Sequence, residues 1–566
     1  MIQDHIENRL QAATLTVLPS AEAKHIRVQV CSDPARGDYQ SNAVMAIAKQ
    51  LQMDSRQLAT EIVSKLDVSD LCEPVEIAGP GFLNFRLQLT AVNAALNAAL
   101  ASETPFLIKT TDPRTVVIDF SSPNVAKPMH VGHIRSTILG DSLARIFRLL
   151  GHKVIADNHI GDWGTQFGML LLGWKTQLDE VSMESDPISE LERLYKLVNS
   201  DDALREDARA ELVKLQQGGE ENLSIWKQMI ALSKQQFDQV YGRLGIEFDR
   251  TLGESFYNPF LVDVVRGLAD NDIAEESDGA MAVFFPKDKQ LADKPAIVRK
   301  RDGAANYMTT DLATLVYRMN EWSPDEIIYV TDGRQQLHFK QLFNIFRRWK
   351  PGACAQLEHV WFGSILGTDG KPFKARSGDS VRLVDLLNES EERAFKIVSE
   401  KNPDLEECER RNIARVVGLG ALKYADLSNN RQSDYVFNWD KMLALQGNTA
   451  PYLQYAYTRI RSIDRKADCP DHSQANISLN TPEELALAKH LMNFGQVLKM
   501  ITDDHRPNFL CNYLYELAAY FSRFYEACPV LKAEGEKESR LALCELTARV
   551  LRQGLDALGI EVTEVM

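Results

Sequence analysis

The segment from residue 115 to residue 156 constrains the possible folds more than any other part of the chain. Residues 115–120 (TVVIDF) and 153–156 (KVIA) are short apolar runs typical of strands. Between them, apolar side chains recur at helical spacing up to a natural helix stop, namely Ile134, Ile138, Leu143, Phe147, Leu150 and Gly151. A strand, a helix and a strand in this order form the unit of parallel sheets. The sequence therefore predicts an α/β protein with a Rossmann-type, doubly wound parallel sheet.

A second strand–helix pair lies far downstream and extends the predicted sheet. Residues 326–330 (EIIYV) are typical of a strand, a Thr-Asp-Gly turn follows at 331–333, and a helical pattern continues to about Trp349. Residues 359–362 predict one further strand. The polar stretch at about 180–290 is mostly helical in pattern, so we expect it to be an insertion between the two halves of the sheet.

The remaining segments predict two further domains on either side of the sheet. A length of 566 residues corresponds to roughly three to four domains. Residues 1–110 predict a small α+β domain, with helices near 40–52 and 55–66 and a strand–turn–strand at 75–87. Residues 111–386 contain the sheet, 387–450 a helical connecting region and 451–566 an α-helical bundle. The helical patterns of the C-terminal half lie at 387–401, 406–425, 481–502, 508–527 and 536–558.

Composition excludes several classes of protein. The chain has 64 Lys and Arg against 79 Asp and Glu, a net charge of −15, which excludes a generally basic nucleic-acid binder but not a local positive surface. No apolar run approaches the length of about 20 residues that spans a bilayer, and the first residues resemble no secretory signal. The eight cysteines are scattered without a CxxC pair. We therefore expect a cytoplasmic protein with reduced thiols, no membrane segment and no structural metal.

The loop after the first strand of the sheet contains HVGH at residues 130–133. Gly132 lets the backbone approach a ligand closely, and the helix start offers unpaired N–H groups to a phosphate. His130 and His133 can donate hydrogen bonds to phosphate oxygens as charge develops in a phosphoryl or adenylyl transition state. Lys127 lies in the same loop. In isolation an incidental pair of histidines is an equally good interpretation, and a metal site would need a third ligand.

Residues 367–379 (GTDGKPFKARSGD) are a second candidate, because three glycines and three cations share one segment. Such a loop can close over a polyphosphate, although a solvated surface loop is the more common interpretation of this composition. Polar residues at the carboxyl ends of the strands are a third candidate, because these ends line the ligand crevice of a doubly wound sheet. They are Asp119, Asn124 and Gln335, and with them we consider Tyr307 and Asp311, which are four residues apart and share one helical face. Spacing alone would class each as a surface or capping residue.

Two long motifs together resemble one family. SSPNVAKPMHVGH at 121–133 and NHIGDWGTQFG at 158–168 are similar to the class I aminoacyl-tRNA synthetases, and specifically to the arginyl-tRNA synthetases. The resemblance continues through GDY (37–39), GPGFLNF (79–85), LGIEFD (244–249), GESFYN (253–258), YMTTDLA (307–313), TDGRQQLH (331–338), KPFKARSGD (371–379), ALKYADLS (421–428) and GNTAPYLQYAYTR (447–459). It therefore covers most of the chain and includes the extra N-terminal domain and the anticodon-binding bundle of that family.

The resemblance implies an ATP-dependent ligation of L-arginine to tRNA(Arg) through an arginyl adenylate, with Mg²⁺ and no membrane partner. We also expect a monomer. The catalytic residues would be His130, Gly132, His133, Lys127 and Lys374, and the ATP-binding residues would be His130, His133, Lys127, Lys371, Lys374 and Arg376. Most class I enzymes have KMSK in this second loop, and here Ala375 stands in the place of the second lysine. The division of work among the loop's cations therefore stays open, and Lys127 is available to supply the missing charge.

The same resemblance implies two further sets of contacts. The arginine pocket would contain Asp119, Ser122, Asn124, His133, Tyr307, Asp311 and Gln335. The tRNA would contact Asn84, Phe85, Tyr452, Tyr455, Tyr457, Arg459 and Met566, although aromatic side chains on helices are more often core. The FRRWK cluster at 346–350 is most simply a solvated helix end. Two alternatives are another HxGH-type nucleotidyl-transfer enzyme, which would need no anticodon bundle, and a non-catalytic tRNA-binding paralogue, which would be expected to lose HVGH or the cationic loop.

Overall fold

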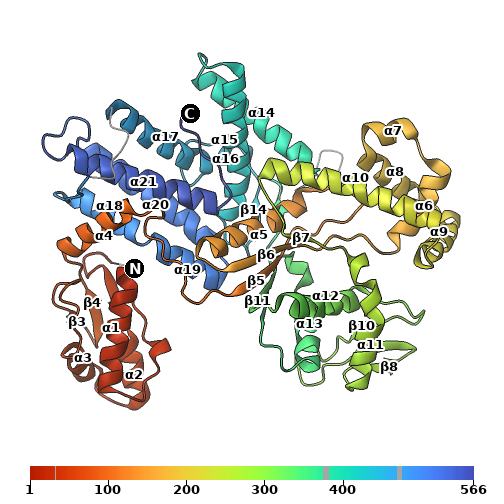
Figure 1. Ribbon diagram of the computed structural model, residues 1–566, viewed down its shortest axis with the longest axis horizontal. Helices are drawn as coiled ribbons and strands as arrows, with labels where there is room; N and C mark the ends of the chain where they lie inside the picture. The colour runs from red at the N-terminus through yellow and green to blue at the C-terminus, as the bar shows by residue number, and fades with distance from the viewer. Residues whose placement is uncertain (32, 374–380, 468–474) are drawn as a thin grey trace.

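A five-stranded parallel sheet lies at the centre of the molecule (Figure 1). The computed structural model describes residues 1–31, 33–373, 381–467 and 475–566. The strand order is β12-β11-β5-β6-β7, and every neighbouring pair is parallel. The strands are β5 (Thr115–Asp119), β6 (Lys153–Asn158), β7 (Arg250–Thr251), β11 (Glu326–Tyr329) and β12 (Gln356–His359). This order confirms the predicted doubly wound sheet. The strand order reverses between β5 and β11, which is the topological switch point of the sheet.

Alternate residues of β5 face two separate apolar cores. Val116 and Ile118 belong to the larger core, which includes side chains of α5 (Val131–Leu149). Val117 belongs to the second core, together with side chains of α12 (Tyr307–Trp322) and α13 (Gln336–Trp349). A parallel strand buried on both faces must be apolar throughout, which explains why residues 115–118 show no alternation. The helices α5 and α13 follow the carboxyl ends of β5 and β11, and therefore begin at one edge of the sheet.

The predicted insertion is divided in two by a return to the sheet. The first part is helical and consists of α6 (Gln166–Gln177), α7 (Glu180–Ser185), α8 (Pro187–Asn199), α9 (Asp202–Gln216) and α10 (Glu220–Leu244). The chain then pairs β7 with β6. The second part contains η2 (Glu254–Phe260), α11 (Leu261–Asp270) and an antiparallel sheet of β8 (Glu275–Ser277), β9 (Ala280–Val283) and β10 (Ala296–Arg299). The stretch at about 180–290 is mostly helical, as expected, but β7 and the strands β8 and β9 interrupt it. A two-residue strand such as β7 leaves no periodic pattern in the sequence.

The N-terminal domain packs three helices on a small antiparallel sheet. Its strands are β1 (Gln29–Val30), β2 (Tyr39–Ser41), β4 (Phe82–Phe85) and β3 (Glu76–Ala78), in that spatial order. The helices α1 (Ile2–Val17), α2 (Ala43–Leu51) and α3 (Ser55–Val63) pack against this sheet; the 3₁₀ turn η1 (Ala23–His25) joins α1 to β1. Gly37 has φ +154°, and a Cβ there would lie 2.9 Å from the carbonyl oxygen of Phe85. Only glycine therefore fits where the loop before β2 crosses β4.

Helix α4 (Leu89–Ala101) belongs with the C-terminal bundle rather than with the N-terminal domain. The side chain of Asn97 donates to the carbonyl oxygen of Ile477 at 3.2 Å, and Arg549 donates to the carbonyl oxygen of Leu100 at 3.0 Å. Figure 1 shows α4 beside α18 and apart from α1–α3. These contacts favour a domain boundary before α4 over the boundary expected at residue 110.

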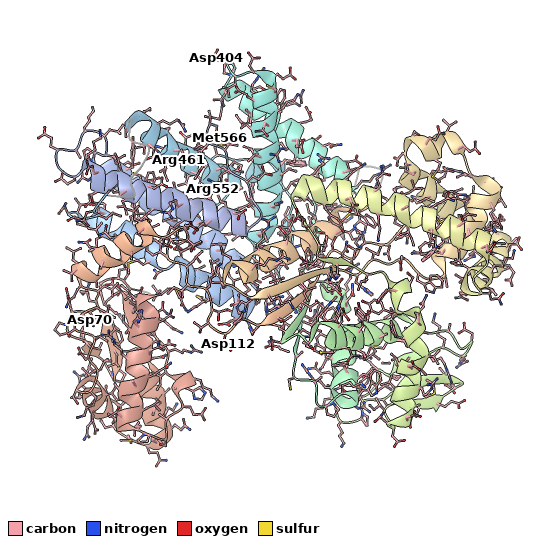
Figure 2. The ribbon with its side chains drawn as sticks, viewed as in Figure 1. Asp70, Asp112, Asp404, Arg461, Arg552 and Met566 are labelled. Carbon is pink, nitrogen blue, oxygen red and sulfur yellow. The ribbon has the colours of Figure 1, made fainter. Side chains whose placement is uncertain are left out.

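The C-terminal half is helical, as predicted. It contains α14 (Leu383–Lys401), α15 (Glu407–Leu427), α16 (Trp439–Met442), α17 (Ala450–Ala467), α18 (Pro482–Met492), α19 (Phe494–Asp504), α20 (Asn508–Ala527) and α21 (Lys537–Ala557). A two-stranded parallel pair of β13 (Ile365–Leu366) and β14 (Tyr435–Val436) joins it to the sheet domain. The helix predicted at 481–502 is two helices that meet at Asn493. Figure 2 shows Arg461, Arg552 and Met566 on the bundle, and Asp404 beyond the end of α14.

The edge strand β12 lies earlier in the chain than expected. The strand predicted at 359–362 lies at 356–359, and Phe362 forms only an isolated bridge with Asp332. In the described part of the chain, no helix is long and apolar enough to cross a membrane.

Candidate functional site

The loops that follow β5 and β11 meet where the winding of the sheet changes direction. The backbone N–H of Val330 donates to the carbonyl oxygen of Asp119 at 2.8 Å. Ser136, in the second turn of α5, donates through its hydroxyl to the carbonyl oxygen of Val330 at 2.6 Å and accepts from the N–H of Ser121 at 2.9 Å. These bonds fix the start of α5 against both strand ends. The crevice at such a point is the usual ligand site of a doubly wound sheet.

The loop after β5 has an unusual backbone. Ser121, Ser122 and Ala126 all have positive φ, at 71°, 47° and 60°, a conformation that costs free energy for residues other than glycine. The loop is held by Asn124, which forms a parallel bridge with Gly161, and by the N–H of Val125, which donates to the carbonyl oxygen of Gly161 at 2.9 Å. Side chains of this loop are therefore presented in directions that an ordinary turn would not give.

The two histidines of HVGH face one another at the start of α5, with ring centroids 4.0 Å apart. The Nδ1 atom of His130 accepts from the N–H of Gly132 at 3.0 Å, and Nδ1 of His133 accepts from the N–H of His130 at 3.1 Å. An Nδ1 atom that accepts a hydrogen bond places the proton of a neutral imidazole on Nε2. Each ring therefore presents an Nε2–H donor. A Cβ at position 132 would lie 2.8 Å from the His130 ring, so glycine is required there.

Both rings are neutral at pH 7. Burial, with a smaller contribution from His130, lowers the pKa of His133 to about 3. Burial also lowers the pKa of His130, and the positive charges of Arg334 and Lys127 lower it further. The site therefore offers two neutral hydrogen-bond donors beside the positive end of a helix, an arrangement suited to phosphate oxygens rather than to acid catalysis by imidazolium.

Two cations, Lys127 and Arg334, lie close enough to His130 to act on its imidazole. Lys127 is partly buried, and its Nζ lies 5.0 Å from the ring centroid of Tyr195 on α8. The segment after residue 380 pairs with the motif, because the N–H of Val131 donates to the carbonyl oxygen of Val381 at 2.9 Å. Lys371 is exposed at the end of a turn that starts at Gly367. Lys374 and Arg376, expected to bind phosphates, lie outside the described residues.

Asp311 is the centre of a second polar group beside the crevice. It accepts from Nε2 of His338 on α13 at 2.6 Å. The His338 ring packs edge-on against Tyr307, with centroids 5.0 Å apart, and the Tyr307 side chain is 65% exposed. Gln335 lies three residues before His338 and, like Asn124 across the crevice, is exposed. The structure therefore brings Tyr307 and Asp311 together, with a histidine that the sequence did not suggest.

Asp119 is engaged by the chain's own guanidinium. Arg318 is completely buried and donates to Asp119 and to Asp157, each at 2.7 Å. The second carboxylate oxygen of Asp119 accepts from the hydroxyl of Ser122 at 3.0 Å. We expected Asp119 to grip a ligand's guanidinium, but its carboxylate already has one inside the fold. Asp119 therefore acts within the fold, through Arg318 and Ser122.

Glu254 is a candidate residue that the sequence reasoning passed over. It is the first residue of η2, and its pKa is raised to about 8, mainly by burial and then by the negative charges of Asp311 and Asp162. A buried carboxyl group that is mostly protonated at pH 7 beside a second carboxylate is a functional-site candidate, because a bound cation would favour its ionised form. The motif GESFYN that contains it was visible in the sequence, but only the fold brings residue 254 near residue 311.

Three family models match consecutive parts of the chain. They describe the arginyl tRNA synthetase N terminal domain (residues 1–87), the catalytic domain of class I (R) tRNA synthetases (residues 95–439) and the DALR anticodon binding domain (residues 453–566). The arginine–tRNA ligase of Chromobacterium violaceum is 46% identical, with 100% of both chains covered. That of Laribacter hongkongensis is 45% identical, with 99% of both covered. The chain belongs to the arginyl-tRNA synthetase family.

Solved structures agree with this assignment. The arginyl-tRNA synthetase of Plasmodium falciparum has a TM-score of 0.86 and 29% identity, and the alignment covers 100% of this chain and 99% of that one. The enzyme of Thermus thermophilus has a TM-score of 0.85 and 27% identity, with 100% of both chains covered. Like its relatives, the chain is a class I ligase that joins arginine to tRNA(Arg) and uses ATP. Neither alternative, another HxGH-type nucleotidyl-transfer enzyme without an anticodon bundle or a non-catalytic tRNA-binding paralogue, fits these full-length matches.

The residues expected to contact tRNA differ in exposure. Tyr455 is 46% exposed, and Arg459 is exposed with its guanidinium 4.8 Å from the ring centroid of Tyr525. Tyr452 packs with its ring centroid 5.7 Å from that of Tyr515. In the N-terminal domain, Asn84 and Phe85 are 5% and 0% exposed. Phe85 therefore stabilises the sheet, and its side chain has no surface for RNA.

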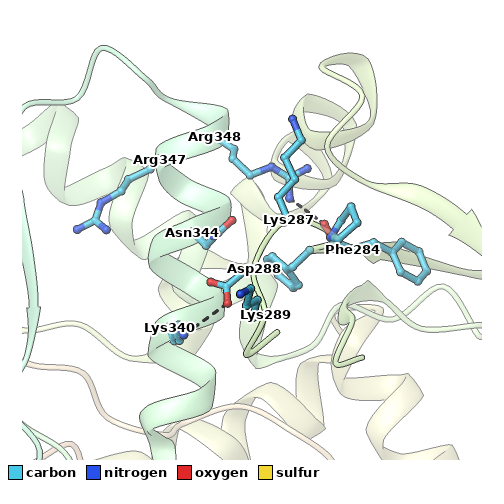
Figure 3. Close-up of a pocket in the computed structure, with 10 residues that line it drawn as sticks. Phe284, Lys287, Asp288, Lys289, Lys340, Asn344, Arg347 and Arg348 are labelled. Atoms are coloured by element: carbon cyan, nitrogen blue, oxygen red, sulfur yellow. Dashed lines mark hydrogen bonds and ion pairs between the residues drawn. The ribbon is translucent and has the colours of Figure 1, made fainter. Parts of the chain in front are cut away.

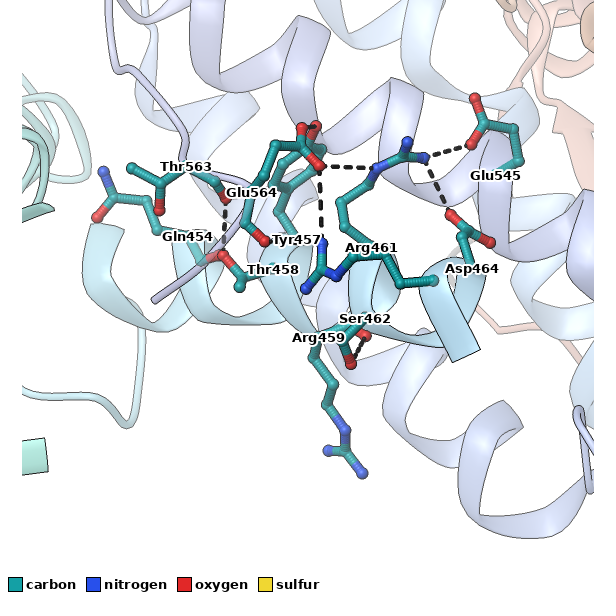
Figure 4. A network of polar contacts seen from close by, with 11 residues as sticks. Gln454, Tyr457, Thr458, Arg459, Arg461, Ser462, Asp464, Glu545, Thr563 and Glu564 are labelled. Carbon is teal, nitrogen blue, oxygen red and sulfur yellow. Dashed lines mark hydrogen bonds and ion pairs between the residues drawn. The ribbon is translucent and has the colours of Figure 1, made fainter. Parts of the chain in front are cut away.

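The last residues of the chain cover part of α17 (Figure 4). Glu564 accepts from the hydroxyl of Tyr457 at 2.7 Å and from Arg461 at 3.2 Å, and Thr458 donates to the carbonyl oxygen of Thr563 at 2.9 Å. Tyr457 is consequently 3% exposed. The partly buried Met566 lies just beyond these contacts, near α17. Of the α17 residues expected to bind RNA, Tyr455 and Arg459 are therefore the accessible ones.

Proposed function

We propose that the HVGH turn binds the phosphates of ATP while the carboxylates around Asp311 bind the guanidinium of arginine. One observation carries this assignment: two neutral histidines present Nε2–H donors at the start of a helix, on the same edge of the sheet as Asp311. In the first step, a carboxylate oxygen of arginine attacks the α-phosphorus of ATP and pyrophosphate leaves. In the second, a hydroxyl of the terminal adenosine attacks the carbonyl carbon of arginyl adenylate and AMP leaves.

No side-chain nucleophile takes part in either step. His130, His133 and the first N–H groups of α5 stabilise the charge that develops on phosphate oxygens in the transition state, while Lys127 and the cations of the 371–376 loop hold the leaving pyrophosphate. The proposed function of the cationic loop is supported by the pairing of residues 129–131 with residues 381–383, which ties the end of the loop to HVGH.

Arginine is bound at both ends in this proposal. Asp311 and Glu254 supply negative charge to the guanidinium, and Tyr307 packs on its plane. Asn124, Gln335 and Ser122, with His133 nearby, hold the α-amino and carboxylate end. Asp119 contributes through Arg318 and Ser122 rather than by direct contact. This arrangement favours arginine over lysine, because a planar guanidinium presents paired N–H donors in a fixed fork that matches carboxylates, whereas the ammonium of lysine is a compact point charge without that geometry.

Mg²⁺ fits this site as a companion of ATP. The described residues include no group of three or more His, Cys, Asp or Glu that could hold a metal ion, and HVGH and Lys127 are nitrogen donors. Mg²⁺ prefers oxygen ligands and is often bound mainly by substrate phosphates and water. It would neutralise phosphate charge when bound. We also propose that the chain acts as a monomer in the cytoplasm, where scattered cysteines stay reduced.

Attachment of each radiolabelled amino acid to total tRNA, with ATP present, tests the proposal. Arginine alone should be attached, and His130→Ala should slow attachment by roughly 10²-fold or more, the effect of one lost transition-state donor. His130→Asn keeps a donor and should retain more activity. Equal rates for the wild-type protein and His130→Ala would contradict the role of HVGH, and attachment of lysine would contradict the pocket.

A further inference from the structure

A cavity of about 830 Å³ lies between the loop after β9 and the second half of α13 (Figure 3). Five cations line it, namely Lys287, Lys289, Lys340, Arg347 and Arg348, and its lining contains a single carboxylate, Asp288. The whole chain has a net charge of −15. The lining of the cavity is therefore positively charged although the whole protein is negatively charged, and such a surface attracts anions.

Two of these cations hold the cavity together. Arg348 donates to the carbonyl oxygen of Phe284 at 3.0 Å and lies 6.0 Å from the ring centroid of Phe285. Lys340 lies 3.6 Å from a carboxylate oxygen of Asp288. These contacts join α13 to the loop after β9, so the cavity has a defined shape.

The other three cations do not join α13 to the loop after β9. Lys287, Lys289 and Arg347 are exposed, and none has a carboxylate partner within the part of the chain that the structure describes. Exposed cations in this protein often do have one, for example Arg209 with Glu206 and Arg411 with Glu407. Three unpaired cations around one cavity therefore leave a positive surface that a ligand can neutralise.

The position of α13 connects this cavity with the active site. The helix begins at Gln336, directly after Gln335, and its His338 bonds to Asp311. A second hollow of about 480 Å³ extends along the same helix and is lined by Gln336, Lys340 and Arg347. Gln336 and Arg347 are separated by about 16 Å along the helix axis. One face of α13 thus runs from the arginine pocket to the cationic cavity.

We propose that Lys287, Lys289 and Arg347 bind backbone phosphates of the tRNA acceptor arm as its 3′ end enters the active site. The terminal adenosine must reach the arginyl adenylate, so the adjoining nucleotides must cross a surface next to the crevice. Phosphodiester groups are negatively charged and can pair with these three cations, which have no carboxylate partner in the described part of the chain. Contacts to backbone phosphates position a nucleic acid without reading its sequence. The predicted solvated helix end at 346–350 is thereby given a function in substrate binding.

The test reverses charge on both sides of the cavity in the full-length protein. Lys287→Glu with Arg347→Glu should raise the Kd for tRNA(Arg) roughly tenfold or more, and should reduce the slope of log K against log salt concentration by about 1.5 to 2, for two lost phosphate contacts. An RNA hairpin of the acceptor arm alone should lose affinity in parallel. Arg347→Lys keeps the charge and should bind tRNA almost normally. The KM values for arginine and ATP, at saturating tRNA, should change little.

Lys396→Glu with Lys401→Glu is the matched control. Both lysines are exposed on α14, and no carboxylate partner for either is found among the described residues. This control has the same change of net charge and should bind the hairpin as the wild-type protein does. Equal effects of the two double variants would overturn the proposal, as would a hairpin affinity unaffected by the cavity variant. A rise confined to the KM for ATP would assign the cavity to a free polyphosphate, which also contradicts binding of RNA.

Discussion

At the scale of single residues, removal of Lys127 should have a clear effect on the formation of the adenylate. It lies close enough to His130 to lower the pKa of that imidazole, and Tyr195 holds its ammonium group. Lys127→Ala should weaken stabilisation of the transition state by about 2–4 kcal/mol. The loss should appear in ATP–pyrophosphate exchange with tRNA present, while the KM for arginine stays nearly constant. A variant with wild-type exchange would show that the 371–376 loop holds the phosphates without Lys127.

Asp311 should decide the affinity for arginine. Its carboxylate is bonded to His338, so Asp311→Asn removes the charge with little change of shape. Truncating one member of a buried charge pair costs roughly 2–5 kcal/mol, and the KM for arginine should therefore rise tenfold or more. The KM for ATP should move much less. If the KM for arginine is unchanged and only the melting temperature falls, Asp311 stabilises α12 and does not bind the substrate.

Glu254 should make arginine binding depend on pH. Its pKa is about 8 in the free protein, so most of the group is protonated at pH 7, and a bound guanidinium favours the ionised form. Affinity should therefore increase as pH rises through the pKa. We expect the KM for arginine to fall by about tenfold between pH 6.5 and 8.5. Glu254→Gln should have a higher and nearly flat KM over this range; an equally steep profile in that variant would assign the pH dependence to another group.

Residues of the site differ in how far the sequence revealed them. HVGH stands in one loop between a strand and a helix, so its position suggested a phosphate site, and the family resemblance favoured that interpretation over an incidental pair of histidines. Glu254 and Asp311 come from elements separated by the antiparallel sheet of the second insertion, and only folding places them together. The bond from Arg318 to Asp119 joins residues 199 positions apart. A carboxylate at a strand end looks the same in the sequence whether it faces a ligand or an internal arginine.

At the scale of elements, Arg318 joins α12 to two strands of the sheet. It is the shared partner of Asp119 on β5 and Asp157 on β6, and all three side chains are buried. Arg318→Leu would leave two buried carboxylates without their cation, and breaking a buried pair in this way costs about 3–5 kcal/mol. The midpoint of denaturant unfolding should fall clearly. Arg209→Leu, which removes an exposed pair, should change the midpoint little, and equal midpoints for both variants would contradict the role of Arg318.

The loss in Arg318→Leu should also depend on pH. Uncompensated buried carboxylates have raised pKa values and take up protons in the folded state. Because the variant's folded state then binds more protons than its unfolded state at neutral pH, its deficit should shrink as pH falls towards 5. A deficit that is constant between pH 5 and 8 would indicate lost packing instead of unpaired charge.

Elements with strong periodicity were predicted and short or interrupted ones were not. The strands β5 and β11 and the helices α5, α13, α20 and α21 follow clear apolar patterns. β7 contains two residues, both exposed, and has no pattern of its own. The break between α18 and α19 falls at Asn493, within a continuous run of helix-forming residues. The ends of these elements depend on tertiary packing, which the local pattern of a single sequence does not reveal.

At the scale of the whole molecule, the N-terminal domain is attached to the bundle by a few polar contacts. Lys499 pairs with Asp4 at 3.0 Å, and Lys489 pairs with Asp38 at 2.7 Å. Removing residues 2–87 keeps α4 on the bundle and should raise the KM for tRNA several-fold more than the KM for ATP. Removing residues 2–110 would also uncover the apolar face that α4 protects, and should lower the melting temperature. Equal rises in both KM values for the shorter deletion would show that the domain does not serve tRNA binding.

The docking of α4 also has a consequence for synthesis on the ribosome. Arg549 bonds to Leu100 across 449 residues of chain, so a helix made early cannot find its final partner until nearly all the chain exists. At roughly 5–20 residues per second, that interval is on the order of 20–90 s. Throughout it, the buried side chains Val92, Leu96 and Ala99 of α4 are without their native cover on the nascent chain. Translation speed and chaperone access during that interval therefore influence how much of the chain reaches the native arrangement.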